Sequence, residues 1–535
     1  MRAVARSTLV AAFWLVSVAH VGSPDVWYQG STGPYGVLVH IEAPGVIPGI
    51  AVVNVRVDGV GVERVSAFAD RFDATGGAPP PDVAEPVAGQ PGWYRTRLWI
   101  MTNGSYSVTV TVAGSAGSGS AVVPLGAFPL RRLDLGSGLA LGLGAAGVFL
   151  LAGILTIIGA SVREAVLPPG AQPDSERRRR ARRAMARGAL VIGLILLGGW
   201  RWWSVEDARF ERSLLRPLAA VATVRGSELE LTIEDSTWAR QQRAEAAGRL
   251  ATDHGKIMHL FLIGETGYAF AHLHPTTPDS VRFVVPLPPL PAGRYSIFGD
   301  IVDVTGFAQT LVASVQLSEV LSSGPAAGLP RDPDDSWAVR EAEPVADTVL
   351  LEDGSALRWL GASTPVVVGE PLELRFALEP APRDDRPPEL YMGMPAHAAV
   401  VRDDARVFVH LHPHGTTSMA ARMRFLERGG GALHAPITAP PPADTVAFPY
   451  AFPEPGRYHV WVQLKRGGRV LTGAFEVQVA PGSGEGRPDR AAPLDDGGAL
   501  EGGAVPLACS GLYPRRCRLK KAIVRSSASF AAASS

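Results

Sequence analysis

The chain has 535 residues, of which 46% are hydrophobic and 19% charged, and its 51 basic and 51 acidic side chains give a formal net charge of zero. This length allows several domains, and zero net charge gives no overall field that would favour nucleic acid as a partner. The only cysteines, Cys509 and Cys517, are not spaced as in a thioredoxin motif or a zinc ribbon.

Residues 1–19 have the composition of a secretory signal peptide. Arg2 and Arg6 precede an apolar stretch, and Ser17-Val18-Ala19 has the small-x-small pattern of a cleavage site. An uncleaved membrane anchor is the alternative, although the segment is short for one. The sequence therefore predicts that the region after residue 19 is exported.

Residues 24–132 are predicted to form an exported β-sandwich. Alternating or valine-rich segments at residues 37–41, 51–57 and 106–112 have the pattern of strands, and glycine and proline clusters separate them. Signals for helices are almost missing, which favours a small all-β domain.

Two segments are predicted to be transmembrane helices. Residues 135–161 form a long uncharged apolar run, above the roughly 20 residues that cross a bilayer. Residues 184–203 are shorter, with Arg187 at one end and three tryptophans near the other, as suits a membrane interface. A buried core helix is the alternative for this second segment.

Residues 162–183, between the two spans, are predicted to be a cytoplasmic loop, because they carry a dense run of arginines. A nucleic-acid patch is the alternative interpretation of the run. Both flanking regions then lie outside the cytoplasm, in agreement with the signal peptide. We expect a multi-pass protein of the cytoplasmic (inner) membrane with both large regions on the periplasmic or extracellular side. Gly138 and Gly142 form a GxxxG motif, but the oligomeric state stays open.

An internal repeat follows the spans, at residues 215–320 and 345–480. Each copy contains an apolar strand, a histidine-rich hairpin, a proline-rich stretch and a Gly-Arg-Tyr tripeptide. A short helix is expected at residues 240–250, a linker at 321–344 and a disordered tail at 481–535. The predicted fold class is therefore mainly β, with three immunoglobulin-like or cupredoxin-like β-sandwich domains plus two transmembrane helices.

The tetrapeptide His-Leu-His-Pro occurs once in each repeat, and a further histidine lies 13 residues before it. This pattern uses six of the 12 histidines in the chain, and histidine is the commonest metal-binding side chain. The six are His259, His272, His274, His397, His410 and His412.

Hairpin geometry predicts that these histidines form two clusters. If the turns are centred on residues 265–266 and 403–404, His259 lies opposite His272 and His397 lies opposite His410. Opposed residues share a face with Cβ atoms about 5 Å apart, and a histidine two residues further along returns to that face. Each hairpin would then present three imidazoles, a set that suits copper or zinc. The same register places Phe261 opposite Phe270.

Further candidate ligands differ between the repeats. His254 precedes the first hairpin, while Met392 and Met394 precede the second. His414, Met419 and Met423 follow it. Thioether and imidazole ligands together favour Cu(I), so copper is the expected cofactor and zinc the alternative. Met258 is expected to face away from the histidines and to fill the core.

The histidines also allow a structural interpretation. They could form a polar network that pins each hairpin, with every ring bonded to the backbone or to an acid such as Asp300. A duplication copies structural histidines as readily as metal ligands, so the sequence leaves both possibilities open.

Both repeats resemble the YtkA-like family. The similar segments are Asp253-His254-Gly255-Lys256 with Met258-His259, Phe270-Ala271-His272-Leu273-His274-Pro275, Pro291-Ala292-Gly293-Arg294-Tyr295, Gly393-Met394-Pro395-Ala396-His397-Ala398 and Phe408-Val409-His410-Leu411-His412-Pro413. The resemblance implies small exported β-sandwich domains, similar in character to FixH-like membrane proteins that are linked with the assembly of metal-containing oxidases. The resemblance also implies that the protein interacts with an envelope metalloprotein or with an oxidase under assembly.

The sequence therefore predicts a membrane-anchored envelope protein whose duplicated exported β domains bind a transition metal, copper first, for metal handling or delivery. A non-metal structural or interaction protein of an envelope complex is the alternative. A metal-dependent enzyme ranks last, because the chain contains no HExxH, GxSxG or P-loop pattern. We expect no enzymatic activity and no catalytic residues.

Overall fold

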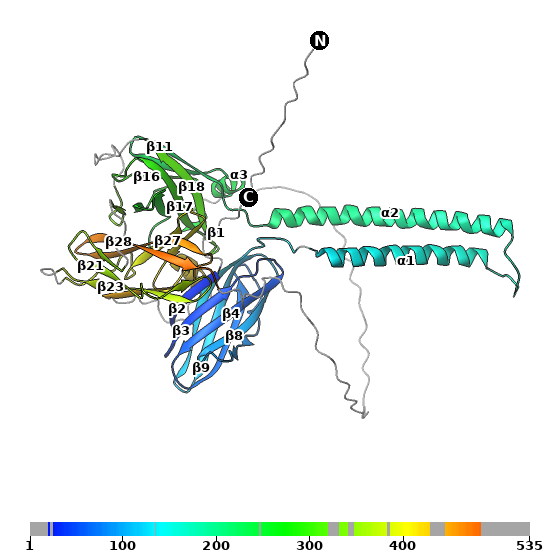
Figure 1. The fold of residues 1–535 in the computed structure, drawn as a ribbon, viewed down its shortest axis with the longest axis horizontal. Helices are drawn as coiled ribbons and strands as arrows, with labels where there is room; N and C mark the ends of the chain where they lie inside the picture. Colours follow the sequence, from blue (N-terminus) through cyan, green and yellow to red (C-terminus); the bar gives the residue numbers. More distant parts are fainter. Residues whose placement is uncertain are drawn as a thin grey trace, which may run out of the picture. The chain divides into compact units, whose positions relative to one another are not determined.

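The computed structural model describes residues 20–21, 25–133, 135–168, 170–244, 248–318, 331–340, 347–381, 386–428 and 444–482. The predicted signal peptide, both cysteines and the predicted tail from residue 483 onward lie outside these residues. The described part is mainly β, with six sheets and two long apolar helices (Figure 1).

The region before the long helices consists of two sheets. The first contains five strands, in the order β2 (Asp25–Thr32), β3 (Tyr35–Glu42), β4 (Gly49–Asp58), β8 (Trp93–Ile100) and β7 (Glu85–Pro86). The second contains β10 (Gly117–Ala127), β9 (Gly104–Gly114), β5 (Val62–Arg71) and β6 (Asp82–Val83). Side chains from both sheets, among them Val39, Val53 and Val110, form one buried core. The three predicted strands lie within β3, β4 and β9.

The two long helices are α1 (Ser137–Arg163) and α2 (Ser175–Ser213), and both are long and apolar enough to span a membrane. Figure 1 shows them side by side, and Gly159 of α1 lies against Met185 of α2. At Gly138 and Gly142, by contrast, a Cβ atom would meet no described atom outside the local helix within 4 Å. Among the described residues, this part of α1 therefore has no close neighbour at the GxxxG motif.

The segment predicted between the two spans, residues 162–183, is helical in its second half, because α2 begins at Ser175. The side chain of Asp174 accepts a hydrogen bond from the backbone N–H of Arg177 (2.7 Å) and so caps the helix. Arginine and alanine, which follow, are good helix formers. The arginines thus lie on the first turns of α2, and the second apolar segment follows them in the same helix.

The first repeat contains two sheets of its own. One consists of β11 (Ala220–Arg225), β12 (Glu228–Ile233) and β16 (Arg282–Pro286). The other consists of β13 (Leu250–Ala251), β17 (Gly293–Asp303), β14 (His259–Gly264), β15 (Ala269–Leu273) and β19 (Ser336–Val339), with β18 (Ala308–Leu317) paired to β17.

Two predictions for this repeat need correction. The helix α3 spans Ser236–Ala244 instead of residues 240–250, because the Asp235 side chain accepts a hydrogen bond from the backbone N–H of Trp238 (2.7 Å) and starts it earlier. The predicted linker is not free of structure, since its strand β19 pairs with β15.

The second repeat has the same plan. One sheet contains β20 (Thr348–Leu350), β21 (Ala356–Leu360), β23 (Leu372–Glu379) and β26 (Thr445–Tyr450). The other contains β1 (His20–Val21), β25 (Val407–Leu411), β24 (His397–Arg402), β27 (Gly456–Arg466), β28 (Arg469–Ala480) and β22 (Val366–Val367). The helix α4 (Met419–Arg428) follows the histidine hairpin. The order β15-β14-β17-β18 in the first repeat therefore corresponds to β25-β24-β27-β28 in the second.

The two repeats pack against each other through the sheet faces that carry the histidines. Aromatic rings from both repeats form a buried cluster there, in which Phe298 stacks on Phe408 (centroids 4.2 Å apart) and Phe270 stacks on Trp461 (4.8 Å). Every residue of β14 is buried, because one face of this strand covers its own core and the other covers the second repeat. The histidine hairpins are thereby brought together.

Candidate metal centre

Both histidine hairpins pair in a register two residues away from the predicted one. His272 lies opposite Phe261 rather than His259, and Phe270 lies opposite Ile263 rather than Phe261. His410 correspondingly lies opposite Ala399 rather than His397.

The turns explain this shift. In each hairpin a backbone bond closes a four-residue turn, from Gly267 N–H to Gly264 C=O (2.8 Å) and from Ala405 N–H to Arg402 C=O (2.7 Å). Gly267 (φ 74°) and Ala405 (φ 58°) then take left-handed conformations, as residues after such turns often do. A shift by two residues preserves which face each side chain occupies, so the predicted shared face is retained.

The predicted clusters are not separate, because the repeats bring them together in one buried centre. His259 approaches His410 of the other repeat with ring centroids 5.1 Å apart, and His272 lies 5.6 Å from His410. The relative exposure of the six predicted histidines is at most 8%. The centre therefore belongs to both repeats and is closed to solvent.

One group of possible ligands matches the predicted first cluster. His259, His272 and His274 each offer a ligand atom, and these atoms lie within 4.8 Å of one another. Nδ1 of His259 and Nε2 of His272 are 3.0 Å apart. The sequence therefore identified the members of this group, although not their register.

Each ring in this group turns its second nitrogen toward a fixed acceptor. His259 Nε2 lies 3.2 Å from the backbone oxygen of Asp253, and His272 Nδ1 lies 2.9 Å from Oε1 of Gln463. His274 Nδ1 lies 3.0 Å from Oδ1 of Asp335, and His274 Nε2 is buried without a hydrogen-bond partner. Metal-binding histidines characteristically donate their outer N–H to such acceptors and leave the inner nitrogen free for the ion.

A second group differs from the predicted cluster. It consists of His254, His397 and His412, again with ligand atoms within 4.8 Å of one another. His254 comes from the first repeat and takes the place that we predicted for His410. His410 instead directs Nδ1 toward Asp300 at 3.4 Å. The prediction that one hairpin supplies all three histidines is therefore wrong for this group.

Several nitrogens of the second group lack partners. Both ring nitrogens of His397 and of His412 are buried without a hydrogen bond, as is Nε2 of His254. An unsatisfied buried polar atom costs about 1–3 kcal/mol. A metal ion is one partner that would satisfy them, because a neutral imidazole nitrogen is a good ligand for zinc and copper.

In each repeat, one residue contacts the first histidine of the His-Leu-His-Pro motif in the other repeat. Asp300 lies opposite His259 in the first repeat, and Gln463 lies opposite His397 in the second. These equivalent residues reach across the interface, Asp300 to His410 and Gln463 to His272. The Asp300 contact was expected for a purely structural network, and it equally suits an acceptor behind a metal ligand.

Burial keeps five of the imidazole rings in the centre uncharged. It lowers the pKa of His259 to about 3 and places the pKa values of His272, His274, His397 and His412 well below their usual value. Neutral rings are required for metal binding.

Asp335 behaves in the opposite way, since burial raises its pKa to about 7. Its Oδ1 accepts from the backbone and ring N–H groups of His274, while Oδ2 has no partner. Oδ1 is therefore an acceptor whether or not Asp335 carries a proton.

The methionines lie in several different environments. Met258 is buried in the core of the first repeat, with an exposed fraction of 1%, as predicted. Met394 is also buried, and the backbone of Met392 hydrogen-bonds the ring of His254. Met419 and Met423 lie on α4, where Met423 is exposed.

Sequence reasoning missed three residues that orient the rings: Asp253 through its carbonyl, Gln463 and Asp335. Gln463 could have been found by aligning the repeats, where it takes the position of Asp300. Asp335 lies in the predicted linker, and its sequence context gives no such signal.

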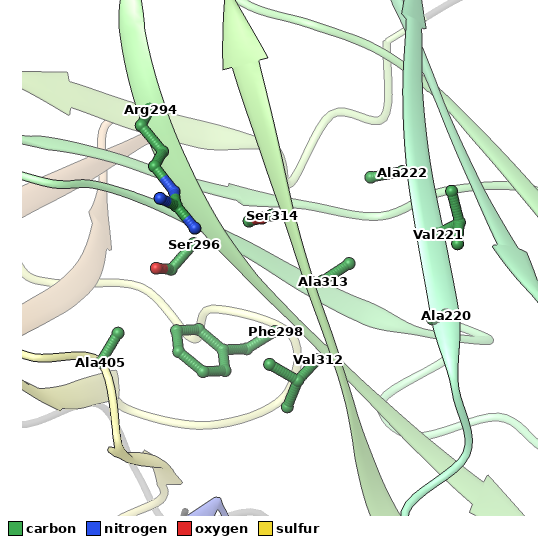
Figure 2. Close-up of a pocket in the computed structure, with 10 residues that line it drawn as sticks. All are labelled: Ala220, Val221, Ala222, Arg294, Ser296, Phe298, Val312, Ala313, Ser314 and Ala405. Atoms are coloured by element: carbon green, nitrogen blue, oxygen red, sulfur yellow. The ribbon is translucent and has the colours of Figure 1, made fainter. Parts of the chain in front are cut away.

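An open depression of about 500 Å³ lies away from the histidines, on strands β11, β17 and β18 (Figure 2). Figure 2 shows that small or apolar side chains line it, with Arg294 as its charged residue. This lining contains no pair of groups suited to acid–base or metal chemistry, so the depression does not compete with the histidine centre as the candidate site.

Comparison with known proteins adds one family match. A family model described as "Domain of unknown function (DUF8832)" matches residues 348–481, in the second repeat. Nothing among the curated proteins matches the chain.

Similar solved structures include alpha-2-macroglobulin from E. coli, with 8% identity and a TM-score of 0.16, over 86% of this chain and 23% of that one. The ICAM-5 D1–D4 ectodomain fragment has 9% identity and a TM-score of 0.13, over 82% of this chain and 74% of that one. The complex of Dpr2 Ig1-Ig2 with DIP-Theta Ig1-Ig3 has 9% identity and a TM-score of 0.13, over 85% and 99%. The chain thus spans 23% of the length of the first structure.

Proposed function

We propose that this protein is a membrane-tethered metal-binding protein of the cell envelope, whose two repeated β domains together hold a transition metal ion. The observation that carries the proposal is the pair His259 and His272. Their inner nitrogens, Nδ1 and Nε2, lie 3.0 Å apart in a buried space, while their outer nitrogens face a carbonyl and an amide oxygen.

Two neutral rings in this arrangement can hydrogen-bond each other only if one of them turns a lone pair toward its outer oxygen acceptor. If both outer N–H groups donate to their acceptors, two lone pairs face each other, and burial disfavours the extra proton that would separate them. Two nitrogens on one tetrahedral ion with bonds of 2.0–2.1 Å would lie about 3.3 Å apart. The observed separation is close to that value.

Copper is the metal that we propose first, with zinc as the alternative. Imidazole suits both ions, and the thioethers of Met392 and Met394 nearby in the sequence would favour Cu(I). Carboxylates face the outer side of the rings, as Asp335 and Asp300 do. This donor set does not suit calcium or magnesium, which prefer oxygen ligands.

The proposed role is metal handling or delivery in the envelope. The arginine-rich start of α2 would lie in the cytoplasm by the positive-inside rule, and the repeats would then lie on the other side of the membrane. The low exposure of the histidines leaves little access for a substrate, which favours a carrier over an enzyme. The resemblance to YtkA-like domains supports an envelope metalloprotein, such as an oxidase under assembly, as the partner.

A structural role is the second candidate, because the contacts of Asp300 and Gln463 across the interface would fasten the repeats without any ion. Titration of the full-length chain in detergent with Cu(I), Cu(II) and Zn²⁺ separates the two. We expect affinity tighter than micromolar that His272→Gln reduces and that His459→Gln, a buried histidine paired with Asp403 outside the centre, leaves unchanged. No binding at micromolar concentrations, or equal binding by both variants, would favour the structural role.

A further inference from the structure

We infer that the centre holds two ions and that each ion takes ligands from both repeats. The inference rests on the proposed function and deepens it. The first ion would lie at His259, His272 and His274 with the thioether of Met392, and the second at His254, His397 and His412.

The two histidine groups are distinct. They have no residue in common, and each places three ligand atoms within 4.8 Å of one another. His254 lies nearer to the second group than to the first, with ring centroids 5.1 Å from His412 and 5.3 Å from His397 but 6.1 Å from His259. One ion cannot bind all six rings, since zinc and copper sites take about four ligands.

The second group carries its own evidence for a ligand. Five of its six ring nitrogens are buried without a hydrogen bond: both of His397, both of His412 and Nε2 of His254. The nearest carboxylate oxygen of Asp253 is 3.8 Å from His254 Nε2, beyond hydrogen-bond distance. These nitrogens come from two repeats and converge on one place, as ligands of an ion do.

His410 lies between the groups. Its ring centroid is 5.1 Å from that of His259 and 4.4 Å from that of His412. Its Nδ1 faces Asp300, whereas Nε2 is buried without a partner. Nε2 is therefore available to either ion as an additional ligand.

His254 and Met392 occupy equivalent turns. Each lies five residues before the first histidine of its hairpin. Asp253 and Lys256 exchange two backbone hydrogen bonds around His254, and Tyr391 and Met394 do the same around Met392. The φ angles agree closely, at 52° and 79° for His254 and Gly255 and at 50° and 78° for Met392 and Gly393.

This equivalence predicts where the Met392 side chain acts. His254 reaches from the turn of the first repeat to the histidines of the second. Because the repeats also exchange Asp300 and Gln463 reciprocally, the same relation directs Met392 toward the histidines of the first. The first ion would then have three nitrogens and one sulfur, a set that favours Cu(I).

Because each proposed ion takes ligands from both repeats, metal binding holds the two repeats together. Asp253, beside His254, already accepts the backbone N–H of Ala420 at the start of α4 in the second repeat (2.9 Å). An ion bound by residues of both repeats stabilises the closed interface and not either domain alone. Loss of the ions would therefore loosen the interface.

The test is an anaerobic Cu(I) titration of the full-length chain in detergent against a chromophoric competitor, with copper X-ray absorption on the loaded protein. We expect two ions per chain, one ion for His254→Gln, and two ions for Met392→Leu, with one bound at least about 10-fold more weakly. Sulfur scattering should be present in the parent chain and absent in Met392→Leu. Met423→Leu, on the exposed side of α4, serves as the control and should match the parent.

The outcomes separate this inference from the proposed function. A parent chain that binds no copper or zinc overturns the proposed function and the inference with it. One ion per chain that His254→Gln leaves unchanged overturns the two-ion inference alone. Two ions without sulfur scattering overturn the assignment of Met392. Equal circular dichroism spectra and gel-filtration profiles of parent and variants establish that the loss of an ion is not a loss of fold.

Discussion

Gln463 and His272 lie 191 positions apart in the chain, yet Oε1 of the first is 2.9 Å from Nδ1 of the second. This contact fixes which nitrogen of His272 faces the centre. It also makes the second repeat responsible for the geometry of a ligand that belongs to the first.

Replacing Gln463 should therefore weaken metal binding without removing a ligand. We expect Gln463→Leu to lower the affinity about 10- to 100-fold, the effect usual for loss of a group behind a metal ligand. Gln463→Glu, which keeps an acceptor, should restore part of the affinity. Competition titrations measure the effect, with the exposed Gln478→Leu on β28 as control. Equal affinities for Gln463→Leu and the control would show that the contact does not orient the ring.

The metal-free protein should lose stability in acid. The unfolded histidines take up protons below about pH 6.5, whereas burial holds the pKa of folded His259 at about 3 and those of His272 and His397 well below normal. The unfolded state thus binds more protons between these values. The free energy of unfolding should fall by about 1 kcal/mol per pH unit for each such histidine as the pH drops.

Asp335 acts in the other direction, because its raised pKa of about 7 stabilises the fold at low pH and the contribution is lost as the pH rises from about 4 to 7. Its contribution to the pH dependence of the unfolding free energy offsets that of about one buried histidine. Thermal unfolding of chelator-treated protein at pH 7.5, 6 and 4.5 measures the sum, and His272→Gln should flatten the dependence. A stability that rises toward pH 4.5 would contradict the burial of neutral rings.

The aromatic contact between the repeats should control both stability and metal binding. Phe408 stacks on Phe298 and lies 5.2 Å from Phe261, which in turn stacks on His272. Phe408→Ala should lower the free energy of unfolding by about 3–5 kcal/mol and also weaken metal binding. Phe376→Ala, buried in the core of the second repeat, should destabilise similarly. If both variants lose metal affinity equally, the effect is one of general stability and the interface has no special part.

The proposed membrane orientation gives a labelling prediction. With both native cysteines replaced, Gly170→Cys between the two helices should not react with an impermeant maleimide in intact cells. Val60→Cys lies in the N-terminal β region, where the side chain is 89% exposed. It should react once the reagent can pass the outer layers of the envelope while the cytoplasmic membrane stays closed. The opposite pattern would place the histidine centre in the cytoplasm.

The sequence predicted which histidines share a strand face, but not the residues that lie opposite them or contact them from the other repeat. Alternation along a strand determines which side chains share a face, and a two-residue shift leaves that unchanged, so His259, His272 and His274 were grouped correctly. The register itself depends on the left-handed residues Gly267 and Ala405, and an alanine gives little sequence signal for that conformation.

The contribution of His254 to the second group could not be predicted in the same way. Strand periodicity describes one hairpin, whereas His254 meets His397 and His412 only through the packing of one repeat on the other. The aromatic face that drives this packing was visible in the sequence as part of an apolar strand. The face that it packs against is the equivalent face of the other repeat, which the duplication supplies.

Metal analysis of the full-length chain, purified without chelators, tests the central claim most directly. The account predicts copper, or else zinc, at stoichiometric amounts in the parent chain and in His459→Gln. It predicts a clear loss in a variant that carries both His259→Gln and His272→Gln. A parent chain free of transition metal, which also takes up none on addition, would contradict the account.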